Sequence, residues 1–120
     1  MRKRFHFPKS RRLSLDSEFQ RVRMEGAWIR GGTLTLGVLK NPEPNAAVRA
    51  GFITSRRVGR AVIRNRTRRR LREIFRKHQH EISGGVWIVT IASAQATRET
   101  SQALEDEWLR LARRASILAS

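Results

Sequence analysis

The spacing of hydrophobic residues along the chain predicts a first helix over residues 14–25. Apolar side chains recur there at intervals of three or four residues, so they share one helical face. These residues are Leu15, Phe19 and Val22. Ser14 is the expected cap, because its hydroxyl can accept from a free amide of the first turn, and Gly26 is the expected stop.

Residues 33–39 alternate between two kinds of side chain, which predicts a strand with one polar face. Leu34, Leu36 and Val38 share the apolar face, and the opposite face carries Thr33, Thr35 and Gly37. Residues 27–30 are a candidate for a short extra strand, and residues 48–54 are expected to form a second strand of hairpin type. Residues 86–92 are almost continuously apolar, which predicts a central strand covered on both faces.

Two longer helices complete the pattern. Residues 60–77, called the basic helix below, have an apolar stripe at Ile63, Leu71, Ile74 and Phe75. The last helix is expected over residues 97–118, with Thr97 as its cap. The predicted order is α-β-β-β-α-β-α, a small α+β sandwich in which helices cover a sheet. At this length we expect one domain, residues 1–120, with residues 1–12 as a flexible basic arm.

Charge adds a partner to this picture. The chain has 26 Lys and Arg residues against 10 Asp and Glu residues, a formal net charge of +16. The basic helix alone contributes +8, since Glu73 is its only acid. Nucleic acid is the expected partner of so basic a domain. Cysteine is absent, and no segment has the length of a signal peptide or membrane span, so we expect a cytoplasmic protein without a membrane partner.

The basic helix has two distinct faces. At 100° per residue, Asn65, Arg69, Arg72 and Arg76 lie within about 60° of one another, opposite the apolar stripe. Such a face can bind several backbone phosphates, although a solvated charged face is the alternative. Asn65 is read either as a specific hydrogen-bonding group for sugar, base or a hydrated metal, or as an exposed filler.

The run from Ser55 to Glu73, SRRVGRAVIRNRTRRRLRE, resembles the RNR motif of the bacterial ribonuclease P protein subunit. The similarity extends over most of the chain. It implies an α-β sandwich with a left-handed β-α-β crossover, and a protein that binds ribonuclease P RNA and helps to remove the 5′ leader of precursor tRNA. It also implies Mg²⁺ held mainly by RNA in the holoenzyme, no cofactor bound by the protein, and no obligate protein partner.

The resemblance also assigns residues. The expected RNA-binding residues are Arg56, Arg57, Arg60, Arg64, Asn65, Arg66, Arg68, Arg69, Arg72 and Arg76. A cleft between the first helix and the sheet is expected to hold the single-stranded leader, with Phe19, Arg23 and Thr35 as its residues. Phe19 can equally be a core residue. Arg23 and Gly37 stand where many members carry aromatic residues, so leader contacts here are expected to depend more on charge.

Protein side chains are not expected to perform the chemistry. Nucleases that act with their own residues need clustered carboxylates or a histidine base, and the acids here are scattered over the first and last helices. His78 and His80 fall on different sides of a helix. We therefore predict no catalytic and no metal-binding residue, and place catalysis in the RNA. The alternatives are a general RNA-binding or ribosomal-type protein and, third, a protein-only nuclease.

Overall fold

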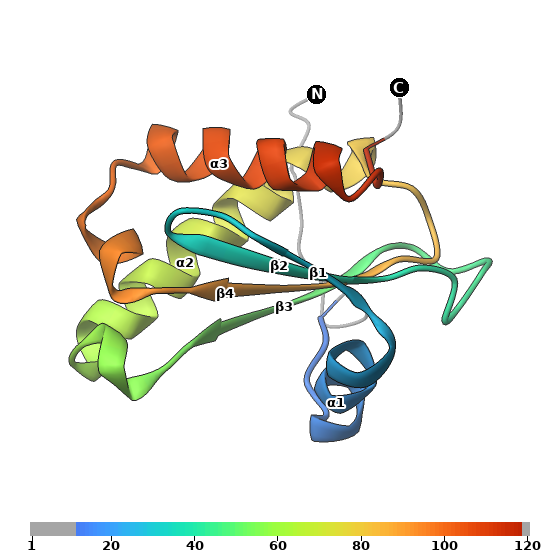
Figure 1. Cartoon of the computed structure of the whole chain (residues 1–120), viewed down its shortest axis with the longest axis horizontal. Coiled ribbons are helices and arrows are strands. Elements are labelled where there is room, and N and C mark those ends of the chain that lie inside the picture. The colour runs from blue at the N-terminus through green and yellow to red at the C-terminus, as the bar shows by residue number, and fades with distance from the viewer. Residues whose placement is uncertain (1–11, 119–120) are drawn as a thin grey trace, which may run out of the picture.

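A computed structural model describes residues 12–118 of the chain as three α-helices packed on a four-stranded sheet (Figure 1). The expected arm, residues 1–12, lies outside the described residues except for Arg12. The helices and strands are α1 Asp16–Glu25, β1 Ala27–Arg30, β2 Leu34–Leu39, β3 Arg49–Thr54, α2 Ala61–His78, β4 Trp87–Ala92 and α3 Ser101–Arg114. This order confirms the predicted α-β-β-β-α-β-α arrangement, including the candidate strand over residues 27–30.

The sheet has the strand order β1-β2-β4-β3. β1 and β2 form the hairpin, in which Arg30 pairs with Thr35, and β2 runs antiparallel to β4. The hairpin pairing expected for residues 48–54 is wrong, because β3 pairs in parallel with β4 and α2 connects the two strands. β4 is central and buried almost throughout, as its apolar run predicts. The left-handed sense of the crossover stays a prediction.

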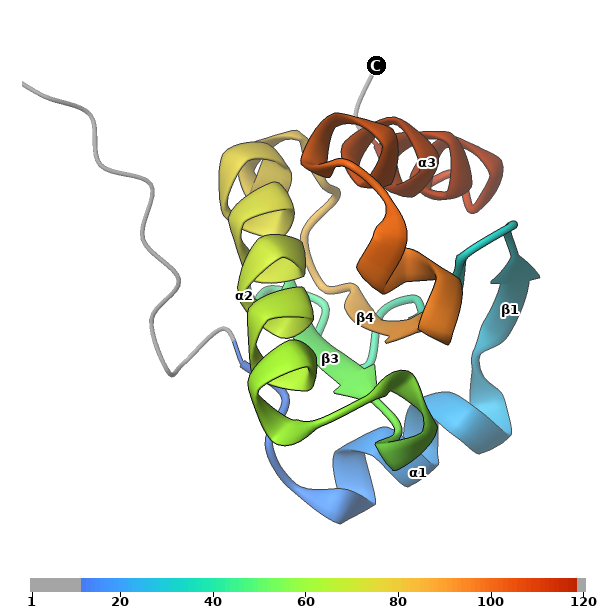
Figure 2. The same ribbon diagram turned by 90° about the vertical axis from the view of Figure 1, so that its left-hand side faces the viewer.

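The main core lies between the sheet and the layer formed by α2 and α3 (Figure 2). Alternate strand residues such as Leu36 and Ile88 point into it and meet Leu71, Phe75 and Trp108 from the two helices. The Trp108 indole N–H donates to the Thr90 hydroxyl at 3.1 Å, so this polar pair is satisfied inside the core. α2 is thus a docked helix and not a charged appendage.

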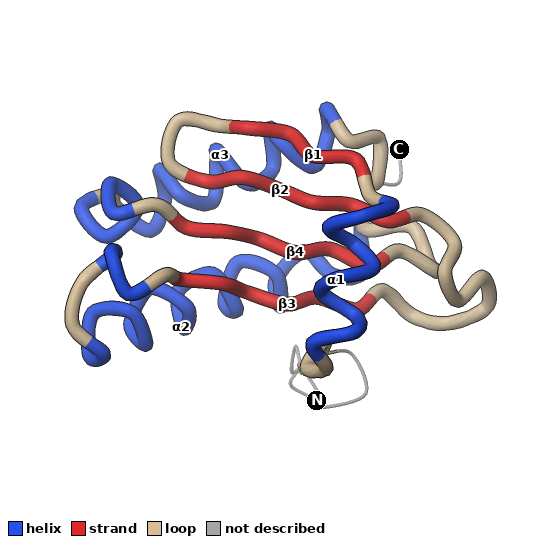
Figure 3. Tube along the Cα trace, turned by 60° about the horizontal axis from the view of Figure 1, so that its bottom comes forward, coloured by secondary structure: helices blue, strands red, loops and turns tan. Residues whose placement is uncertain are grey.

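Of the three α-helices in residues 12–118, only α1 lies on the opposite face of the sheet, where it crosses one end of the strands (Figure 3). A smaller core forms beneath it from Leu13, Val22, Trp87 and Val89. Because α1 is short, it leaves part of this face without a helix above it. The face of β2 that was expected to be polar belongs to this side, and Gly37 on it is buried.

The helix starts differ from the sequence prediction. α1 begins at Asp16 and Ser14 does not cap it; instead a Glu18 carboxylate oxygen accepts from the amides of Ser14 and Leu15 at 3.0 and 3.1 Å. The same carboxylate lies 2.5 Å from the Arg49 guanidinium. Burial alone would raise the pKa of Glu18, but these amide hydrogen bonds and Arg49 lower it.

The last helix is shorter than predicted at both ends. Thr97 lies in a 3₁₀ turn, Ala94–Arg98, and the cap is Thr100, whose hydroxyl accepts from the Ala103 amide at 3.0 Å. α3 ends at Arg114 and not at residue 118, since Ser116 has a φ of 58° that cannot continue a right-handed helix.

Candidate nucleic-acid interface

α2 presents a row of arginine side chains on the face turned away from the core. Thr67, Leu71, Ile74 and Phe75 form its buried side. Ile63 was expected in the apolar stripe, but 37% of it is exposed, and Thr67 takes the buried place by donating its hydroxyl to the Ile63 carbonyl at 2.9 Å. On the other side of the helix, Arg66, Arg69 and Arg72 are exposed.

Arg72 stands at the centre of this charged face. Burial and the nearby charges of Arg12, Arg68 and Arg69 lower its pKa. Arg12, Arg68 and Arg69 thus each lie near enough to Arg72 for their charges to act on it. We call these four arginines the α2 basic face. A row of like charges raises the free energy of the folded protein unless an anionic partner relieves it.

Arg12 is a member of this face that the sequence did not identify. Its backbone bridges to Ala50 on β3, and its carbonyl accepts from the Arg49 guanidinium at 2.9 Å. These contacts hold the last residue of the predicted arm beside α2. Nothing in the local pattern of residues 1–12 indicates this placement, because it depends on strand pairing nearly forty residues away.

Three polar residues of α2 have roles that the structure makes plain. The Arg68 guanidinium donates to the side-chain oxygen of Asn65, which is exposed. A direct contact of Asn65 with RNA stays a prediction. Arg76 pairs with Glu73 at 2.6 Å, which offsets part of its charge. Arg70 donates to the Glu99 carbonyl and to the Ser101 hydroxyl, and thereby ties α2 to the start of α3.

The remaining predicted arginines gather at the N-terminal end of α2. Arg56 and Arg57 are exposed in a 3₁₀ turn, Arg56–Val58, and Arg60 is the exposed N-cap residue. Gly59 between them has a φ of 147°, a conformation that favours glycine. Arg64 is half-buried and Arg66 exposed one and two turns further on. The positive end of the helix dipole adds to their field.

The C-terminal end of α2 is fixed to α3 by His78. Its Nε2 lies 2.6 Å from a Glu105 oxygen, and its Nδ1 lies 2.5 Å from a Glu81 oxygen. Burial alone would lower the pKa of His78, but the hydrogen bonds and charges of Glu105 and Glu81 raise it above its ordinary value. A protonated His78 therefore forms an ion pair with both carboxylates.

We expect His78 to make the stability of the protein depend on pH. Its pKa is raised on folding, so its stabilisation is fully present below about pH 6.5 and is lost as the pH rises through the folded-state pKa. Urea unfolding at a series of pH values should therefore show a fall in stability that His78→Gln reduces. Parallel curves for wild type and variant would contradict this role.

A mainly apolar cavity of about 470 Å³ opens on the other face of the sheet, beside α1. It is lined by Phe19, Gln20, Arg23, Trp28, Ile53, Val89 and Ile91. Two of the predicted cleft residues, Phe19 and Arg23, are thus brought together. Thr35 is not in the lining, although it is half-buried and pairs with Ile91 on the same face.

The two aromatic rings of this cleft each pack against a glycine, whose missing side chain leaves room for the ring. A Cβ on Gly51 would lie 2.6 Å from the Phe19 ring, and a Cβ on Gly37 would lie 2.5 Å from the Trp28 ring. Both glycines pair with Val89 of β4, so the rings flank Val89 on one row of the sheet. Trp28 is an aromatic cleft residue that the sequence did not reveal. The strand pairing of Trp28 with Gly37 would have indicated it.

The buried acidic residue of α3 has a structural role. Glu107 is buried and accepts from the Thr33 and Leu34 amides at 2.9 and 2.7 Å and from the Thr33 hydroxyl at 2.8 Å. Among residues 12–118, no group of three or more histidine, aspartate or glutamate side chains is placed to hold a metal ion. No helix in that range is long and apolar enough to cross a membrane.

The fold and these two surfaces define a class: a small basic α+β protein with a row of arginines on one face and a mainly apolar cleft on the other. A family model described as Ribonuclease P matches residues 7–116. The chain therefore belongs to the ribonuclease P protein family.

Individual relatives agree with this assignment. The ribonuclease P protein component of Syntrophomonas wolfei is 31% identical over 111 residues, covering 92% of each chain. That of Chloroflexus aggregans is 36% identical over 113 residues, covering 93% of this chain and 82% of the relative. The solved structure of the Staphylococcus aureus RNase P protein matches with a TM-score of 0.83 at 25% identity, over 92% of this chain and 99% of that one. The Thermotoga maritima RNase P protein matches with a TM-score of 0.75 at 28% identity, over 86% and 96%.

Proposed function

We propose that this chain is the protein subunit of ribonuclease P, which binds the catalytic RNA through α2 and the 5′ leader of precursor tRNA in the cleft. The observation that carries the proposal is the placement of the α2 basic face and the aromatic cleft on opposite sides of one sheet. One protein can then hold two RNA segments at once. Its part in the reaction is to position the leader for endonucleolytic removal.

The α2 basic face supports binding to folded RNA. The charges of Arg12, Arg68 and Arg69 act on Arg72, and the arginines at the start of α2 extend the positive surface. A planar guanidinium can grip a phosphate with two hydrogen bonds, and each contact releases condensed counterions. The Asn65 contact fixes the direction of Arg68, which reduces the entropy lost when a phosphate binds.

The cleft supports binding to unpaired nucleotides. Its floor of Ile53, Val89 and Ile91 is apolar, and Phe19 supplies an aromatic wall. A base in a duplex is already stacked, whereas a base in a single-stranded leader can exchange water for these surfaces. Arg23 at the rim offers a positive charge to the backbone beside such a base.

Chemistry belongs to the RNA in this proposal. The buried carboxylates Glu18 and Glu107 are occupied by amide hydrogen bonds, and each has a structural role. Mg²⁺ is held mainly by RNA phosphates, and the net charge of +16 lets the protein lower the repulsion between the leader and the catalytic RNA. A cytoplasmic location is part of the same proposal.

Reconstitution tests the proposed function. At a low Mg²⁺ concentration that leaves a bacterial ribonuclease P RNA nearly inactive, adding the protein should restore cleavage of labelled precursor tRNA. The protein should also raise the affinity of the assembled complex for precursor over mature tRNA. Equal affinities, with no gain in cleavage, would instead identify a general RNA-binding or ribosomal-type protein. Cleavage that survives removal of all RNA would identify a protein-only nuclease.

A further inference from the structure

We propose that Trp28 is the base-stacking platform of the cleft and determines its preference for a single-stranded leader. This inference rests on the proposed function, because it assigns a residue within the same cleft. The chemical class recognised is an unpaired nucleobase, which would enter the cleft beside the Trp28 ring.

Trp28 is held in place by the strands beneath it. It lies on the edge strand β1 and pairs with Gly37 of β2, whose missing side chain leaves room for the indole. Three carbon atoms of the ring lie 2.5 to 2.8 Å from the position of a Gly37 Cβ. These atoms form the outer edge of the six-membered ring, which lies so close to β2 that any larger residue at position 37 would displace it.

Trp28 differs from the other two tryptophans in its exposure. Of its surface, 38% is exposed, compared with 6% for Trp87 and 0% for Trp108. Trp28 also belongs to neither hydrophobic core cluster of residues 12–118. A large aromatic residue held rigidly at the mouth of a cavity, and not needed to fill a core, is suited to bind a ligand.

The surroundings of the ring favour a nucleobase. The Phe19 ring packs over Gly51, which pairs with Val89 just as Gly37 does, so the two rings lie on either side of Val89. The space between them has aromatic sides and an apolar floor. Arg23 and Gln20 line the α1 side and can hydrogen bond to a phosphate or a base edge. The positive charge of the protein favours a polyanion that carries flat aromatic groups, which is single-stranded nucleic acid.

Phe19 cannot by itself provide this platform. It is half-buried and packs with the smaller core beneath α1, so its ring is partly committed to the fold. Trp28 has no such commitment in the described part of the chain. Changing Trp28 should therefore alter leader binding while α1 and the sheet stay packed.

The test compares the affinity of the reconstituted complex for precursor and for mature tRNA in two variants. Trp28→Leu keeps an apolar side chain over Gly37 but has no aromatic face, and Trp28→Phe restores one. We expect Trp28→Leu to lower the precursor-to-mature affinity ratio by about 5-fold to 150-fold, the range for loss of one stacked base. Trp28→Phe should retain most of the ratio. Equal ratios for the two variants would overturn the stacking role.

A direct readout uses the full-length protein and a single-stranded leader oligonucleotide. Stacking on a base should quench the fluorescence of Trp28, and the two buried tryptophans should contribute little change. The quenching should disappear in Trp28→Leu. If the wild-type protein shows quenching but the reconstituted complex shows no precursor preference, the proposed function fails and the stacking site stands. Unchanged quenching in Trp28→Leu would overturn the stacking site alone.

A matched pair of glycine variants leaves Trp28 in the chain. Gly37→Ala places a Cβ against the indole and should displace the ring, so it should reduce the affinity ratio as Trp28→Leu does. Gly32→Ala is the control, because its Cβ would meet only a Glu107 oxygen, at 4.0 Å. A Gly37→Ala protein that folds and binds precursor like the Gly32→Ala protein would contradict the proposed seat of the ring.

Discussion

Replacing Arg68, Arg69 and Arg72 together with alanine is expected to weaken binding to ribonuclease P RNA and to flatten its dependence on salt. Each lost phosphate contact removes about 0.7 to 0.9 from the slope of log affinity against log salt, so the triple variant should lose about 2 to 3. The physical reason is that these guanidinium groups cluster around Arg72 and can neutralise adjacent phosphates. Binding measured over a salt series gives the slope.

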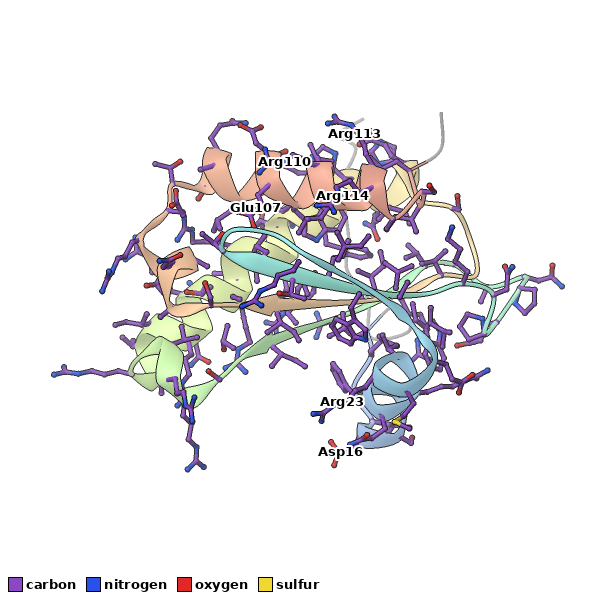
Figure 4. All side chains as sticks on the ribbon, in the orientation of Figure 1. Asp16, Arg23, Glu107, Arg110, Arg113 and Arg114 are labelled. Carbon is purple, nitrogen blue, oxygen red and sulfur yellow. The ribbon has the colours of Figure 1, made fainter. Side chains whose placement is uncertain are left out.

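A second triple variant separates this surface from net charge. Arg110, Arg113 and Arg114 are exposed on α3 (Figure 4). Replacing them with alanine removes three positive charges, the same number as in the first triple variant. We expect the slope of log affinity against log salt for the α3 variant to differ from the wild-type slope by no more than the effect of about one phosphate contact. If both triple variants flatten the slope equally, the overall charge of the protein attracts the RNA and the α2 basic face is not the contact.

Phe75→Ala is expected to lower the free energy of unfolding by about 3 to 5 kcal/mol. Phe75 is fully buried and makes edge contacts with Phe52 and Trp108, at centroid distances of 6.1 and 6.4 Å. Its removal leaves a cavity between α2 and both the sheet and α3. Since small domains have about 5 to 15 kcal/mol of stability in total, urea unfolding should detect the loss readily.

Val62→Ala is the control for this effect on the same helix. Val62 is 73% exposed, so its replacement should change the free energy of unfolding by less than about 0.5 kcal/mol. An effect of Phe75→Ala as small as that of Val62→Ala would mean that α2 is not docked as described. RNA binding should fall with Phe75→Ala only when part of the protein is unfolded, because Phe75 lies in the main core on the buried side of α2.

Local patterns were sufficient to predict α2 and β4. The apolar positions of α2 have helical spacing, and the run of β4 leaves no polar face, so each pattern has one structural solution. It was harder to predict which strands pair with each other. The sequence of residues 48–54 suits a strand of a hairpin and a strand parallel to β4 equally well. Tertiary packing decides between these two arrangements.

Long-range contacts explain the remaining differences. At the start of α1, the Glu18 carboxylate takes the capping role that was expected of Ser14. Arg49, far along the chain, pairs with this carboxylate and holds it near the amide of Ser14. Arg12 and Trp28 became candidate site residues only when strand pairing placed them beside Arg72 and Gly37. Sequence spacing reveals which residues share one helix or strand, whereas a site built across several elements depends on register.

Because side chains alternate along the strands, substitutions that face the cleft are separated from substitutions that face the main core. Gly37 and Val89 face the cleft, while their neighbours Leu36 and Ile88 face the main core. Substitutions at the cleft positions can therefore alter contacts with a ligand without repacking the layer that carries α2. Related proteins can diversify in what they accept on one side of the sheet and keep the arginine-bearing helix α2 unchanged on the other.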